Sequence, residues 1–146
     1  MADITRGMND QPKRATGGCL CGAVRYEATG EPLWAGLCCC VDCRKTSGSG
    51  YIPFIGYSSS ALTFIGETRQ ALSTAASGGG AVRNFCPVCG SLVFGGIVGT
   101  DAVHTIYAGS LDDPSLFQPT VAIFNKDRPS WVVLPRGITI WEKMPG

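Results

Sequence analysis

Several patterns that mark large classes of proteins are absent from this chain of 146 residues. No apolar stretch approaches the length of a membrane-spanning helix, and no basic run accompanies the formal charge of +1, so neither a membrane nor a nucleic acid is an expected partner. The sequence has no P-loop and no glycine fingerprint for a dinucleotide. No segment carries a sustained apolar stripe with the period of a helix. These absences leave a β-rich protein as the expectation.

The first residues also lack the apolar run of a signal peptide. Residues 1–16 read MADITRGMNDQPKRAT, which is polar throughout. We therefore expect a cytoplasmic protein, in which cysteines stay reduced. The length predicts one domain over residues 16–146, preceded by a flexible tail over residues 1–15.

Short β-type runs separated by turn residues fill the rest of the chain. The 20 glycines and 9 prolines predict many turns, and Gly78-Gly79-Gly80 predicts a flexible loop. We expect strands over residues 23–28, 50–57, 62–65, 91–94, 103–108, 121–124 and 138–141. One helical turn is expected over residues 42–47. This pattern predicts a mainly β fold, a sandwich or a curled sheet with little helix.

The eight cysteines are present in three short clusters. These clusters read Cys19-Leu-Cys21-Gly, Cys38-Cys39-Cys40-Val-Asp-Cys43 and Cys86-Pro-Val-Cys89-Gly. Thiolates at one- and two-residue gaps, often followed by glycine, are typical of zinc sites. In a reducing compartment this spacing favours metal ligands over disulfides.

The first and third clusters predict one closed structural site. Cys86 and Cys89 form a zinc knuckle, which supplies two ligands and needs two more. Cys19 and Cys21 lie two residues apart, so in an extended strand both side chains point to the same face. Four thiolates would join the start of the domain to a hairpin much later in the chain.

The second cluster predicts a different kind of site. Cys38 and Cys40 share a face of an extended segment, Cys39 points the other way, and Cys43 follows Cys40 at i, i+3. Three protein ligands with one open position are the arrangement of a catalytic zinc. The alternative is that all four cysteines of this cluster close a second structural site.

With these motifs the chain resembles the glutathione-dependent formaldehyde-activating enzymes, whose fold is a tent of curled antiparallel β-sheets clipped by zinc. The resemblance spans residues 17–142. Its motifs are the segments 17–26 (GGCLCGAVRY), 38–48 (CCCVDCRKTSG), 83–91 (RNFCPVCGS), 109–114 (GSLDDP) and Pro129-Ser130-Trp131. It departs from the family at Cys39, where histidine is common, and in the strand near 121–124, which lacks a histidine.

The resemblance implies two zinc ions per chain. It assigns a structural zinc to Cys19, Cys21, Cys86 and Cys89, and a catalytic zinc to Cys38, Cys40 and Cys43. The implied activity is that of a carbon–sulfur lyase, S-(hydroxymethyl)glutathione synthase-like, which forms or reverses the bond between glutathione and formaldehyde. Arg44, Lys45 and Arg83 are candidates for binding the glutathione carboxylates, with a solvated surface position as the alternative. A homo-oligomer is compatible with the sequence.

Of two rival functions, one stays open and the other is set aside. A non-catalytic zinc-binding module of the same fold would have a middle cluster that closes on itself. A sulfoxide reductase with two zinc pairs needs a reactive cysteine near its C-terminal end, and none follows Cys89.

The remaining predictions concern aromatic side chains. His104, the only histidine, is predicted to lie on the surface of a strand. The three tryptophans are predicted to pack in the core or at a pocket rim; they are Trp34, Trp131 and Trp141.

Overall fold

The computed structural model describes residues 13–74 and 78–146, which form eleven strands, one α-helix and four short 3₁₀ segments. The strands are β1 (Arg14–Gly18), β2 (Arg25–Thr29), β3 (Trp34–Cys38), β4 (Ile52–Ser58), β5 (Leu62–Ile65), β6 (Arg69–Thr74), β7 (Gly80–Phe85), β8 (Leu92–Gly95), β9 (Val103–Tyr107), β10 (Val121–Ile123) and β11 (Thr139–Ile140). The helix is α2 (Val41–Ser47), and the 3₁₀ segments are η1 (Ser59–Ala61), η2 (Ala108–Ser110), η3 (Pro114–Leu116) and η4 (Asn125–Asp127).

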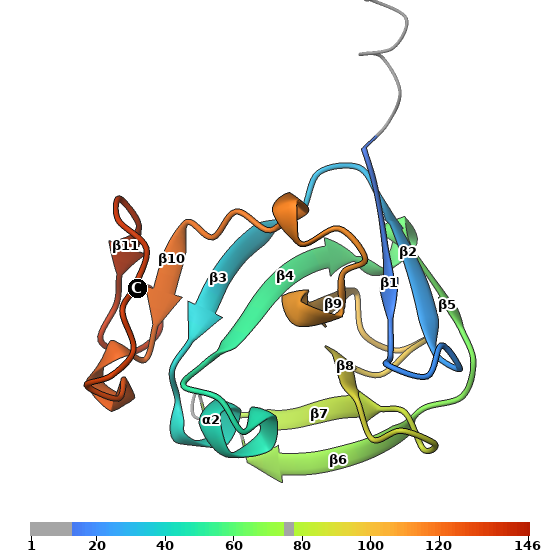
Figure 1. Ribbon diagram of the computed structural model, residues 1–146, viewed down its shortest axis with the longest axis horizontal. Helices are drawn as coiled ribbons and strands as arrows, with labels where there is room; N and C mark the ends of the chain where they lie inside the picture. The colour runs from blue at the N-terminus through green and yellow to red at the C-terminus, as the bar shows by residue number, and fades with distance from the viewer. Residues whose placement is uncertain (1–12, 75–77) are drawn as a thin grey trace, which may run out of the picture.

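The strands make two sheets, as Figure 1 shows. The small antiparallel sheet has the order β1-β2-β5, and the large sheet has the order β11-β10-β3-β4-β9-β8-β7-β6. In Figure 1 the large sheet curls from β10 and β3 round to β7 and β6. The predicted mainly β fold of curled sheets is confirmed. One detail differs, because β10 pairs in parallel with both β3 and β11, whereas the other pairs are antiparallel.

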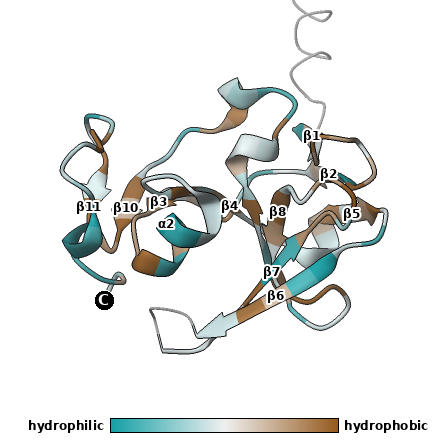
Figure 2. Cartoon of the chain, turned by 60° about the horizontal axis from the view of Figure 1, so that its bottom comes forward, coloured by the Kyte–Doolittle hydropathy of each residue, from teal (hydrophilic) through white to brown (hydrophobic). Residues whose placement is uncertain are grey.

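The main core lies between the two sheets. The small sheet contributes Tyr26 and Ala28, and the large sheet contributes Ile55, Phe94 and Ile106, all buried. Figure 2 shows hydrophobic residues along β8 and β10. Because side chains alternate along a strand, the remaining residues of the large sheet face its other side. That second face is free to carry a binding site.

His104 corrects a prediction from the sequence. It lies on the core side of β9 and is 2% exposed, so it is not a surface residue. Its ring packs edge-on against Phe64 and Phe94, with centroid distances of 5.3 and 5.8 Å. Its Nδ1 lies 3.0 Å from the carbonyl oxygen of Gly95. The histidine is thus a hydrogen-bonded core residue rather than a metal ligand.

The predicted domain boundary also needs adjustment. β1 begins at Arg14, inside the segment predicted as a tail, and Ala15 is buried in the core. The rest of that predicted tail, residues 1–12, lies outside the described residues. The predicted glycine loop is shorter than expected, since Gly80 already begins β7.

Candidate metal centres

The first cluster is formed by two turns that meet at one end of the large and small sheets. Cys19 and Cys21 lie in the turn between β1 and β2, and Cys86 and Cys89 in the turn between β7 and β8. In each turn the cysteine pair is followed by a glycine with positive φ, +84° at Gly22 and +77° at Gly90. The structure brings together the four predicted sulfurs, but it corrects the expected geometry, because Cys19 and Cys21 lie in a tight turn and not in an extended strand.

The sulfur separations fit a tetrahedral metal ion. The Sγ atoms of Cys19 and Cys21 are 3.6 Å apart, and those of Cys21 and Cys86 are 3.7 Å apart. A tetrahedral zinc with bonds of about 2.3 Å places its sulfurs about 3.8 Å apart. A disulfide needs about 2.05 Å, and all eight cysteines are free. This cluster could therefore hold a metal ion, and its geometry is compatible with zinc.

Backbone and hydroxyl groups stabilise negative charge on these sulfurs. The amide of Val24 donates to Cys19 Sγ at 3.2 Å, and the amide of Val88 donates to Cys86 Sγ at 3.4 Å. The Ser91 hydroxyl, 3.1 Å from Cys89 Sγ, makes the largest contribution among the hydrogen bonds that lower the pKa of Cys89 to about 5. Such contacts from outside the ligand set orient the ligands of a metal.

The second cluster lies where β3 passes into α2. Cys38 is the last residue of β3, Cys40 is the N-cap of α2, and Cys43 lies in its first turn. The Cys43 amide donates to Cys40 Sγ at 3.3 Å, so the cap itself holds two of the sulfurs near each other. The three sulfurs lie within 4.8 Å of one another. Cys39 is not a member of this cluster; its side chain is fully buried and its amide donates to the Ile123 carbonyl.

The second cluster also favours a cation. Hydrogen bonds from the Cys38 and Cys43 thiols lower the pKa of Cys40 far below its usual value. The same contacts, led by the one to Cys40, raise the pKa of Cys38. A thiolate is thus favoured at Cys40, which is largely buried. A metal ion that binds three thiolates would neutralise that charge.

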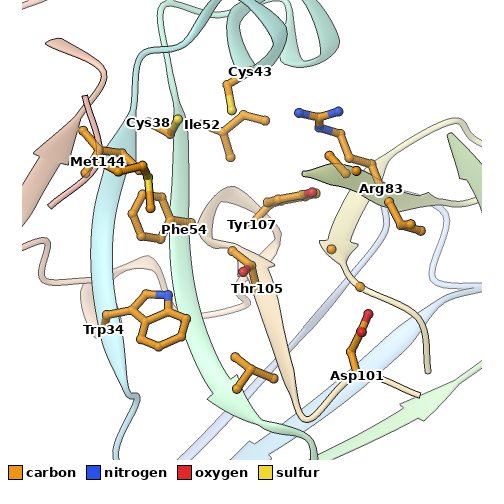
Figure 3. Close-up of a pocket in the computed structure, with 17 residues that line it drawn as sticks. Trp34, Cys38, Cys43, Ile52, Phe54, Arg83, Asp101, Thr105, Tyr107 and Met144 are labelled. Carbon is orange, nitrogen blue, oxygen red and sulfur yellow. The ribbon is translucent and has the colours of Figure 1, made fainter. Parts of the chain in front are cut away.

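A pocket of about 440 Å³ opens beside the second cluster (Figure 3). Cys38 and Cys43 form part of its wall, and Cys40 does not. The rest of the wall comes from strands of the large sheet, from residues next to them and from Met144. Its members are Trp34 of β3, Ile52 and Phe54 of β4, Gly80 to Arg83 of β7, Gly95 of β8 with the following Gly96, Val103, Thr105 and Tyr107 of β9 with the preceding Asp101, and Ile123 of β10.

The three basic residues proposed from the sequence have different positions. Arg83 lines the pocket, is 6% exposed, and donates from Nη1 to Ser73 Oγ at 2.7 Å. No carboxylate among the described residues forms an ion pair with it. Arg44 and Lys45 do not line this pocket, and Lys45 is exposed on α2.

Sequence reasoning missed most of the pocket wall. Phe54 and Tyr107 are predicted from the sequence only as strand residues, whereas Trp34, predicted in the core or at a pocket rim, does lie in the wall. Their alternation with buried neighbours, such as Ile55 and Ile106, was a signal for a second face, because i and i+2 residues of a strand point the same way. The burial of Tyr107 raises the pKa of its phenol, so the hydroxyl in the wall stays protonated at neutral pH.

The fold and the two cysteine clusters define a mainly β protein with two potential thiolate metal sites. The chain belongs to the glutathione-dependent formaldehyde-activating enzyme family, whose profile matches residues 14–127. The two clusters, Cys19/Cys21/Cys86/Cys89 and Cys38/Cys40/Cys43, lie within that range.

Other comparisons bear on the fold alone. The structure is similar to the crystal structure of a protein from Rhodobacter sphaeroides determined by structural genomics. The two share 21% sequence identity with a TM-score of 0.50, over 86% of this chain and 98% of that one. No curated protein matches the chain. None of the helices described here is long and apolar enough to cross a membrane.

Proposed function

We propose that this protein is a zinc-dependent carbon–sulfur lyase that makes or breaks the bond between a thiol sulfur and an aldehyde carbon. The family to which it belongs indicates glutathione as the thiol and formaldehyde as the aldehyde. The observation that carries the proposal is the position of Cys38 and Cys43 in the wall of a pocket of about 440 Å³. The sulfur cluster thus faces a space large enough for a small substrate.

The ligand sets support two different metal roles. Cys19, Cys21, Cys86 and Cys89 would hold a structural ion, and Cys38, Cys40 and Cys43 the ion at the pocket. If Cys38, Cys40 and Cys43 hold zinc, the ion would supply a position for a substrate sulfur and would lower the pKa of that thiol. Because Cys38 and Cys43 border the pocket, the substrate would approach from their side.

Arg83 would stabilise the negative charge of a bound thiolate. Three cysteine thiolates and one divalent cation carry a net charge of −1, which disfavours a further anion. Arg83 is the one cation in the pocket wall as described, and Ser73 holds its guanidinium in place. We expect it to offset that charge and to accept a hydrogen-bonded anion.

Tyr107 would supply a proton or a hydrogen bond to the substrate oxygen. When the sulfur–carbon bond forms, the carbonyl π bond breaks and the aldehyde oxygen takes up a proton; in reverse, the oxygen loses it. The raised pKa of Tyr107 keeps its hydroxyl in the donor form. No redox change is involved, so the reaction needs no nicotinamide or flavin.

The test replaces one sulfur of the pocket cluster. Cys43→Ser should leave the four-cysteine cluster whole, so the protein should fold, but it should hold only about one zinc per chain. Glutathione binding, measured by calorimetry, and exchange between formaldehyde, glutathione and their adduct should both be lost. The matched control is Cys39→Ser, because Cys39 lies outside the cluster.

The opposite result would favour the non-catalytic alternative. If Cys43→Ser binds glutathione as tightly as the unchanged protein, the cluster does not receive the substrate sulfur. The chain would then be a zinc-binding module of the same fold.

A further inference from the structure

The pocket wall carries few charges for a site that is to bind glutathione. Its charged members outside the cysteine cluster are Arg83 and Asp101. Glutathione at neutral pH carries two carboxylates and one ammonium. Asp101 already accepts the Ile97 amide at 2.6 Å, and Arg44 and Lys45 lie outside the wall. One carboxylate of glutathione would therefore face apolar wall, which is costly without a partner.

The part of the pocket away from Arg83 is aromatic and apolar. Figure 3 shows the Trp34 indole, the Phe54 ring and the Met144 side chain gathered on one side of the pocket, opposite Arg83 and Asp101. Trp34 and Met144 remain 46% and 48% exposed, so about half of each is left uncovered by the described chain. These side chains offer a surface to a ligand rather than filling a core.

Two glycines make room for this aromatic surface. In the β3–β4 pair, Trp34 lies opposite Gly56, and Phe54 lies opposite Gly36. A Cβ at Gly56 would collide with the Trp34 indole, and a Cβ at Gly36 would lie 2.8 Å from Phe54 Cζ. Each ring therefore lies across the glycine of the neighbouring strand. Glycine weakens a strand interior and often marks a place of close approach, so the flat aromatic floor has a cost in stability.

We propose that the substrate of this protein carries an apolar, ring-sized group that lies on the aromatic floor formed by Trp34 and Phe54. The inference rests on the proposed thiol–aldehyde chemistry at the three-cysteine cluster. The ring-sized group can belong to the thiol or to the aldehyde, since both end in the same adduct. In that adduct the sulfur–carbon bond has formed, the carbonyl π bond has broken, and the oxygen has taken the proton that the thiol lost.

The experiment compares four substrate pairs with zinc-loaded protein. The thiol is glutathione or phenylmethanethiol, the aldehyde is formaldehyde or phenylacetaldehyde, and the catalysed formation of each adduct is followed by NMR. We expect at least one pair with a phenyl group to exceed glutathione with formaldehyde by about tenfold or more in kcat/KM, which is the scale of burying a ring. The pair that gains identifies which partner carries the group.

Substitutions locate the effect on the aromatic floor. Trp34→Ala should remove most of the preference for the phenyl-bearing pair over glutathione with formaldehyde. Trp131→Ala is the control, because Trp131 is 70% exposed and does not line the pocket. Met144→Lys adds a cation to the apolar side and should shift the preference toward glutathione.

The outcomes separate this inference from the proposed function. Equal or better use of glutathione with formaldehyde, unaffected by Trp34→Ala, overturns the inference and keeps the lyase. If no pair reacts, the lyase is wrong, and calorimetric binding of phenylmethanethiol and glutathione decides the inference. Tighter binding of phenylmethanethiol that Trp34→Ala abolishes supports it, and tighter binding of glutathione overturns it.

Discussion

Cys39 shows how two neighbouring residues of the same type can have different roles. It lies between Cys38 and Cys40, yet it is fully buried and its sulfur is outside the three-sulfur cluster. Burial raises the pKa of its thiol, so it stays protonated at neutral pH. A protonated thiol is a poor metal ligand. The alternation inferred from the sequence thus agrees with the position of this side chain.

Replacement of Cys39 tests this difference. We expect Cys39→Ser to keep the zinc content of the unchanged protein, with a moderate fall in the melting temperature because a hydroxyl replaces a buried thiol. Metal content by mass spectrometry and a thermal melt give the two readings. Loss of one zinc per chain would show that Cys39 is a ligand and that the middle cluster is closed.

Asp112 joins the first two strands to the segment after β9. It accepts hydrogen bonds from Arg25 Nη1 at 2.9 Å and from Thr16 Oγ1 at 2.8 Å, and it also pairs with Arg25 Nη2. The Arg25 hydrogen bond, followed by that of Thr16, lowers the pKa of Asp112 from 3.8 to about 2. Because the folded state has the lower pKa, this carboxylate stabilises the fold above about pH 4 and loses that effect as the pH falls toward 2.

The lowered pKa of Asp112 predicts how the stability of the Asp112→Asn variant depends on pH. The variant should melt below the unchanged protein at pH 7, and the difference should shrink between pH 4 and pH 2. Circular dichroism melts across this range provide the measurement, with Asp113→Asn as a neighbouring carboxylate that does not bind Arg25. A difference that stays constant down to pH 2 would contradict the assigned role.

At the scale of elements, the four-cysteine cluster joins two turns that belong to different sheets. One turn connects β1 and β2 of the small sheet, and the other connects β7 and β8 of the large sheet. Both turns are short and held by N–H···S contacts. A metal ion there would therefore stabilise the packing of one sheet on the other.

Cys86→Ser is expected to destabilise the whole fold. A structural zinc contributes on the order of 10 kcal/mol in small domains, which is comparable to the total stability of a domain. We expect the variant to be unfolded or aggregated after purification. The control is Val88→Ser, because Val88 lies in the same turn and is 75% exposed. A melting temperature for Cys86→Ser equal to that of the control would contradict a structural role.

The elements that the sequence predicts well are those with local signals. The runs predicted over 50–57, 62–65 and 103–108 contain β-branched and aromatic residues between turn residues. Strands form there at Ile52–Ser58, Leu62–Ile65 and Val103–Tyr107. The helical turn predicted over 42–47 is present as α2. In these segments local propensity and the final sheet agree.

The missed strands depend on partners that are distant in the sequence. β1 reads RATGG and β6 reads RQALST, and neither has a β-type pattern. β6 is exposed along its whole length and forms only because β7 pairs with it at the edge of the sheet. β3, WAGLC, contains a glycine that is needed opposite Phe54. Pairing decides these strands, and a single sequence does not display its pairing.

The candidate site likewise has a part that local sequence predicts and a part that depends on segments distant in the sequence. The cysteines could be grouped into short clusters by their spacing, because residues close in the sequence can place their sulfurs together. The pocket wall could not, because its members come from β3, β4, β7, β9 and the residues near Met144. The whole-molecule curl of the large sheet, seen in Figure 1, brings these segments to one face.

The four-cysteine cluster also closes a long loop of the chain. Cys21 and Cys86 are 65 residues apart, and the pocket cluster at 38–43 lies inside the loop that they close. Closing a loop of that length lowers the entropy of the unfolded chain. In the chain-entropy model for cross-links this raises the free energy of the unfolded state by about 4 kcal/mol. The pocket cluster thus lies within the segment whose freedom the four-cysteine cluster limits. Loss of a metal ion from the four-cysteine cluster would release the chain on both sides of residues 38–43, so chelation there would also loosen the pocket.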